Sequence, residues 1–174
     1  LLKFENQIIA AFKDKFIIRT YSPVTTIGGG EIIDINIDGK WNQNKKYINE
    51  LSNEKIEYKI IEKIIQRNDK FVFTKSKLSK HLSLSINILD GLLNKIKDLK
   101  FFLTEDPWII TLEQYNLYSK NIIKILMSLH KKNPYNKGFL LDEINNKMLL
   151  PDNLLKCILS DLCKDKKIKV ESDI

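Results

Sequence analysis

The residues best able to do chemistry in this chain are scattered along it. The two histidines, His81 and His130, each lie near the end of an expected helix, without a histidine or cysteine partner at metal-site spacing. Cys157 and Cys163 are expected on roughly opposite faces of one helix, which suits neither a disulfide nor a metal site. The sequence therefore predicts no catalytic residue and no metal site. Four carboxylates are expected at solvent-facing positions: Asp14, Asp34, Glu54 and Asp90.

Half of the chain's six glycines form one run, Gly28, Gly29 and Gly30. No lysine follows the run and no helix is expected to start there, so it is not a nucleotide-binding loop. Glycines between two strands would let backbone amides approach a phosphate closely, and Arg19 on the preceding strand could pair with that phosphate. The alternative is a β-bulge at the corner of a barrel. The sequence leaves both interpretations open.

The chain opens with β-type sequence. Residues 16–21 are β-branched and aromatic, Pro23 interrupts them, and residues 25–27 and 31–35 predict strands on both sides of the glycines. About three strands cannot close a core by themselves. We therefore expect residues 1–37 to be the tail of an antiparallel β domain whose other strands lie upstream or in another chain. The first residue is not methionine, which fits a piece of a longer protein.

The remaining sequence changes to a helical period. An apolar stripe runs from Lys45 to Gln66, and a strand at 71–73, helices at 76–82 and 86–99 and a hairpin at 101–111 follow it. This order of elements is typical of a winged helix. Trp41 is expected to fix the junction with the preceding strands, with Tyr47 as a neighbour. Trp108 is expected to anchor the hairpin to the core rather than to stack on a base.

The pattern recurs nearer the C-terminus. Helices are expected at 117–129, 139–148 and 151–163, and a strand at 168–170. Leu89, Leu93 and Ile96 match Leu155, Leu159 and Leu162 at an offset of 66, as in a tandem repeat. The predicted fold class is α+β, mainly α with small β. The predicted domains are 1–42 (terminal strands of a β domain), 43–112 (first winged helix) and 113–174 (second winged helix, with its wing truncated).

Positive charge is concentrated in the helical part. The net charge of the chain is +7, but residues 1–42 are neutral, residues 43–112 carry +4 and residues 113–174 carry +3. Such a balance permits contact with nucleic acid. The two expected third helices contain no arginine and mix both signs of charge, which disfavours sequence-specific reading of DNA. Candidates for nonspecific RNA contact are Lys75, Lys77, Lys80, Lys95 and Lys97.

The opening stretch carries a resemblance to a known family. Residues 16–19 (FIIR), 21–23 (YSP) and 26–30 (TIGGG) closely resemble the end of the third domain of the bacterial-type selenocysteine-specific translation elongation factor. That domain is a β-barrel similar to the last barrel of elongation factor Tu, and winged helices follow it. The resemblance therefore implies that residues 1–42 are the C-terminal strands of such a barrel. Residues 133–138 (NPYNKG) are similar to the family's entry into its second winged helix.

The resemblance implies a function for the whole factor. The family uses GTP, with magnesium, to deliver selenocysteyl-tRNA to the ribosome at recoded UGA codons. Its GTPase domain and the last winged helix, which binds the selenocysteine-insertion mRNA hairpin, would both lie outside these residues. This part would have no enzymatic activity and no cofactor, and would be the cytoplasmic arm between the tRNA-binding body and the mRNA-binding tip. Arg19 and Gly28–Gly30 would face the tRNA, so Gly29→Val is expected to weaken tRNA binding without unfolding the barrel.

Two other interpretations remain open. A tandem winged-helix DNA-binding transcription regulator would not need the opening strands. A different translational GTPase with an unrelated helical extension would not need the YSP and GGG motifs. No apolar run is long enough to predict a membrane span.

Overall fold

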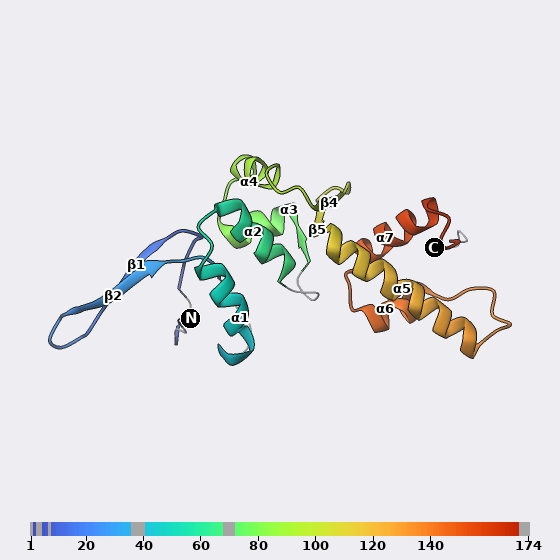
Figure 1. The fold of residues 1–174 in the computed structure, drawn as a ribbon, viewed down its shortest axis with the longest axis horizontal. Coiled ribbons are helices and arrows are strands. Elements are labelled where there is room, and N and C mark those ends of the chain that lie inside the picture. Colours follow the sequence, from blue (N-terminus) through green and yellow to red (C-terminus); the bar gives the residue numbers. More distant parts are fainter. Residues whose placement is uncertain (1, 3–4, 7, 36–40, 68–71, 171–174) are drawn as a thin grey trace. The chain divides into compact units, whose positions relative to one another are not determined.

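The computed structural model describes residues 2, 5–6, 8–35, 41–67 and 72–170, and within these ranges it contains seven helices and two small antiparallel sheets (Figure 1). The α+β fold class is therefore confirmed. The chain separates into two compact units: the first comprises residues 1–67 and 74–97, and the second comprises residues 68–73 and 98–174. The side chain of Trp41 lies outside what the structure describes, as does its predicted role at the junction.

A two-stranded hairpin begins the first unit. Strand β1 (Lys15–Arg19) pairs antiparallel with β2 (Thr26–Glu31), and the register shifts between Ile18 and Arg19. Two backbone hydrogen bonds continue the pairing just outside the strands. Lys13 N donates to Ile32 O (2.7 Å), and Ile32 N donates to Asp14 O (2.9 Å). The prediction that the glycines lie between two strands was wrong, because all three are paired residues inside β2. The predicted strand over 31–35 ends at Glu31.

Four helices complete the first unit: α1 (Trp41–Ser52), α2 (Glu57–Gln66), α3 (Lys75–Leu82) and α4 (Ile86–Leu93). The single apolar stripe of residues 45–66 is thus two helices. Glu54 causes the break, because its Oε1 accepts from the backbone amides of Lys55 and Ile56, both at 3.1 Å, just before α2 begins. The helix expected to reach residue 99 ends at Leu93. Fully buried side chains from all four helices form the core, among them Leu51, Ile61, Leu78 and Leu89.

Three short strands form the second sheet, in the order β3 (Phe73–Thr74), β5 (Trp108–Thr111) and β4 (Leu99–Phe102). The 21-residue helix α5 (Leu112–Lys132) follows β5 directly. Its start is capped reciprocally, because Thr111 Oγ1 accepts from Gln114 N (3.1 Å) and Gln114 Oε1 accepts from Thr111 N (3.0 Å). The successive elements α2, β3, α3, α4 and the β4–β5 hairpin follow the predicted order, while the winged-helix assignment and its domain boundaries stay predictions.

Helices α6 (Leu141–Met148) and α7 (Asp152–Lys164) pack against α5 (Figure 1). The core of the second unit contains Ile122, Leu154, Leu155, Ile158 and Leu162, all fully buried. Trp108 belongs to the same core and is 7% exposed, which confirms its predicted role as a hairpin anchor. Residues 168–170 do not form the predicted strand. The chain turns at Lys166 (φ 58°), and the amide of Lys167 closes the end of α7 on Leu162 O at 3.0 Å.

Candidate nucleic-acid interface

The β1–β2 hairpin is largely open to solvent and carries the predicted tRNA-contact residues. Lys15, Ile17 and Arg19 are exposed and alternate with the half-buried Phe16 and Ile18. Every residue of β2 is exposed. The sheet has only these two strands among the described residues, so the outer edge of each strand leaves backbone donors and acceptors available to a partner.

The three glycines differ in what their missing side chains allow. A Cβ at Gly29 would lie 2.5 Å from the backbone oxygen of Phe16, and a Cβ at Gly30 would lie 3.1 Å from the Phe16 ring. A Cβ at Gly28 would meet no atom within 4 Å. Strand packing therefore explains the glycines at 29 and 30, whereas Gly28 is the position that packing leaves unexplained.

The predicted RNA-contact lysines lie on α3 and in the turn after α4. Lys77, Lys80, Lys95 and Lys97 are exposed. The Lys75 Nζ forms an ion pair with Asp90 at 2.7 Å. The charge of Lys75 is thus already neutralised, and Lys80, Lys95 and Lys97 are better placed than Lys75 for a phosphate.

A buried charged cluster in the first unit is the feature that sequence reasoning missed. The Asp34 side chain is completely buried and accepts three hydrogen bonds. Its Oδ2 lies 2.6 Å from the Tyr47 hydroxyl and 3.1 Å from the Arg67 guanidinium, and its Oδ1 lies 2.8 Å from His81 Nε2. We refer to these four residues as the Asp34 cluster.

The Asp34 cluster corrects two predictions. Asp34 does not face solvent, and His81 is not isolated, because the fold brings them together from positions 47 residues apart. Each partner comes from a different helix: Tyr47 from α1, Arg67 from the end of α2 and His81 from α3. The cluster therefore joins the base of the hairpin to three helices. The only sequence signal was an aspartate following the apolar pair Ile32–Ile33 at the end of a strand-like run.

Tyr47 is held on both sides within the cluster. Its hydroxyl donates to Asp34, and the Arg67 guanidinium lies 4.7 Å from the centre of its ring. Burial, reinforced by the negative charge of Asp34, raises the pKa of the Tyr47 hydroxyl well above its usual value near 10. The phenol therefore remains a donor to Asp34 in alkaline solution.

The raised pKa of Tyr47 predicts a pH dependence of stability. The pKa of the Tyr47 hydroxyl is higher in the folded protein than in the unfolded chain. The contribution of Tyr47 to the free energy of unfolding is therefore fully present below about pH 10 and declines as the pH rises further. We expect Tyr47→Phe to cost about 1.5–3 kcal/mol at neutral pH through the lost hydrogen bond to the Asp34 carboxylate. Urea unfolding of both proteins from pH 7 to 11.5 should show this difference shrinking above pH 10. A difference that stays constant would contradict the prediction.

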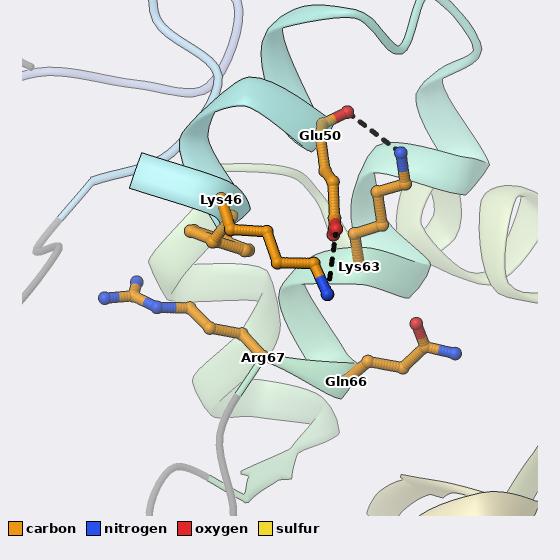
Figure 2. A pocket seen from close by; sticks show the side chains of 6 residues that line it. Lys46, Glu50, Lys63, Gln66 and Arg67 are labelled. Carbon is orange, nitrogen blue, oxygen red and sulfur yellow. Dashed lines mark hydrogen bonds and ion pairs between the residues drawn. The ribbon is translucent and has the colours of Figure 1, made fainter. Parts of the chain in front are cut away.

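A pocket opens between α1 and α2 beside the cluster, lined by Lys46, Tyr47, Glu50, Lys63, Gln66 and Arg67 (Figure 2). Each cation in it has a partner. Lys46 pairs loosely with Glu50 (3.9 Å), and Lys63 pairs with Glu54 (3.7 Å) and also donates to the backbone oxygen of Glu50 (2.9 Å). Arg67 is engaged by Asp34. Three cations face three carboxylates, so the charge of this pocket does not favour a phosphate.

No family model matches the chain, and no curated protein matches it either. Within the ranges that the structure describes, no three His, Cys, Asp or Glu side chains gather where they could hold a metal ion. No helix in the same ranges has both the length and the apolar character needed to cross a membrane.

Proposed function

We propose that this chain is part of a GTP-dependent translation factor that delivers selenocysteyl-tRNA to the ribosome at recoded UGA codons. In this proposal the chain is the arm between the tRNA-binding body and the part that binds the mRNA hairpin. The β1–β2 hairpin would touch the tRNA backbone through Arg19 and Gly28, and the helical units would add weak RNA contacts.

The observation that carries the proposal is the hairpin itself, whose sequence resembles the family at FIIR, YSP and TIGGG. The hairpin offers the Arg19 guanidinium and, among the described residues, two outer strand edges whose backbone amides are suitable donors for phosphate oxygens. The Asp34 cluster ties the base of this hairpin to three helices, as an arm that holds a tRNA-binding edge in place would require.

The exposed face of α4 argues against the alternative of a DNA-binding regulator. Ile86 is 48% exposed and Ile88 is 56% exposed, where a helix that reads bases would carry hydrogen-bond donors. Between them, Asn87 is also exposed. We therefore keep the regulator as an outcome of the test rather than as a second proposal.

The test is a titration of the chain with the selenocysteine tRNA, a selenocysteine-insertion hairpin, an unrelated RNA hairpin and a DNA duplex. Each titration is run at two salt concentrations, because contacts limited to phosphates lose affinity steeply with salt. Weak, salt-sensitive binding to all three RNAs is expected. Tight, salt-resistant preference for the DNA duplex would overturn the proposal in favour of the regulator.

A matched pair of variants tests the hairpin contact. Arg19→Gln is expected to lower tRNA affinity about tenfold, the loss of one charged hydrogen bond. Lys15→Gln removes a charge from the same face of the same strand and is expected to have a smaller effect, because a lysine is a point charge without the bidentate fork. Equal affinities for wild type and Arg19→Gln would contradict the proposed contact.

A further inference from the structure

The outer face of α5 carries a basic stripe. Residues 114–141 contain five lysines and no aspartate or glutamate. Lys120, Lys124 and Lys131 follow one another at spacings of four and seven, so they lie on one face of the helix, and all three are exposed. With a rise of about 1.5 Å per residue, the stripe is about 16 Å long. Met127 lies on the same face and is 66% exposed.

The stripe leads into a loop of defined shape between α5 and α6. The amide of Asn136 donates to Asn133 O at 3.1 Å, which closes a turn with Pro134 and Tyr135 at its centre. Proline at the second position of such a turn fixes its backbone. Tyr135 stands third and is 99% exposed. The loop thus presents a whole aromatic ring to solvent.

The base of the same loop is closed by an aromatic contact. The rings of His130 and Phe139 meet edge to face, with centroids 4.8 Å apart and an interplanar angle of 78°. Residues 130–138 are all exposed and include Lys131, Lys132 and Lys137. The last turn of α5 and the loop after it therefore combine the exposed Tyr135 ring with three ammonium groups.

The charge of this surface is not neutralised within the chain. The five lysines, Lys120, Lys124, Lys131, Lys132 and Lys137, form no ion pair with any residue that the structure describes. By contrast, Lys100 in the same unit pairs with Asp161 at 2.7 Å. Stabilisation of the C-terminus of α5 accounts for Lys131 and Lys132. It does not account for the other three lysines or for the exposed ring of Tyr135.

We infer that this surface, the five lysines together with Tyr135, binds single-stranded RNA. The lysines of α5 would follow the phosphates, and one unstacked base would stack on the Tyr135 ring. A basic stripe alone would suit any polyanion, and the exposed ring favours a strand with free bases over an acidic protein surface. The preference for RNA over single-stranded DNA rests on the proposed function.

The test uses the whole chain and a labelled, unstructured RNA oligonucleotide. The comparison probes are duplex RNA and single-stranded DNA of the same sequence, and an acidic peptide. Tyr135→Ala is expected to weaken binding of the single strand about 5- to 100-fold, whereas Tyr135→Phe keeps the ring and the affinity. The double variant Lys131→Ser/Lys132→Ser is expected to reduce the salt slope of binding by about 1.4. Lys156→Ser/Lys169→Ser removes two exposed charges elsewhere in the same unit and should leave the affinity nearly unchanged.

Three results would overturn the inference. In the first, the loop variants, shown to be folded by thermal unfolding, bind the RNA strand as wild type does. In the second, duplex RNA or single-stranded DNA binds more tightly than the RNA strand. In the third, an acidic peptide binds as well as RNA and is insensitive to Tyr135→Ala. The proposed function is judged separately, since Arg19→Gln reports on tRNA contact at the hairpin whether or not the loop binds RNA.

Discussion

Replacement of Asp34 by alanine is expected to destabilise the first unit by about 3–5 kcal/mol. The carboxylate is completely buried, and its removal would leave the Arg67 guanidinium, which is 13% exposed, without a counter-charge. The Tyr47 hydroxyl and His81 Nε2 would lose their acceptor at the same time. A buried donor without a partner retains the full cost of leaving water. The loss therefore exceeds the value of any one of the three hydrogen bonds.

Urea unfolding, monitored through hydrogen exchange of the α2 amides, measures the lost free energy of unfolding in the first unit itself. Asp98→Ala, at the start of the second unit, is the control for loss of an aspartate as such, because Asp98 is exposed and its carboxylate has no ion pair among the described residues. The control should change the free energy of unfolding by no more than about 0.5 kcal/mol. If the two variants were equally stable, Asp34 would not be the centre of a stabilising cluster.

Gly29→Ala and Gly28→Ala are expected to act in opposite directions, although they are neighbours in one strand. The Cβ at position 29 would overlap the backbone oxygen of Phe16 at 2.5 Å, so β1 and β2 must separate there, at a cost of about 1–3 kcal/mol. The Cβ at position 28 meets nothing and restricts the unfolded chain, which is neutral or stabilising by up to about 1 kcal/mol. Any substitution at Gly29 therefore changes the hairpin before it reports on tRNA.

Exchange protection of the Ile32 amide, which donates to Asp14 O at 2.9 Å, measures how well the hairpin stays paired. Protection should fall in Gly29→Ala and persist in Gly28→Ala. If both variants kept full protection, the close approach of Gly29 to Phe16 would not restrict the strand. The comparison also replaces the Gly29→Val test expected from sequence, since Gly28 is the glycine that can be changed without disturbing the strands.

Elements marked by regular apolar spacing could be predicted from the sequence. The α3 helix, the β4–β5 hairpin and the helices α5 to α7 follow the expected order, because each buries an apolar stripe or a β-branched run. Their ends were harder to predict. The break between α1 and α2 depends on one Glu54 carboxylate bound to two backbone amides, and apolar periodicity carries no information about such a bond.

For a related reason, the sequence pointed to the hairpin residues of the candidate site but not to the Asp34 cluster. Arg19 and Gly28 could be proposed as contact residues because motif and strand pattern are local in sequence, and this role stays a prediction. The Asp34 cluster could not, because its members are 13, 33 and 47 residues from Asp34 and no spacing rule links them. A buried charge is recognised by its partners, and these are known only once the helices are packed.

The order of synthesis along the chain determines when the Asp34 cluster can form. Asp34 is made 47 residues before His81, the last of its partners. At about 5–20 residues per second, the carboxylate waits roughly 2–9 s for its complete set of donors. Until α3 has been made, the base of the hairpin has no full set of contacts to hold it against the helices. The Asp34 cluster therefore closes late, and Asp34, its most N-terminal residue, waits longest for its partners.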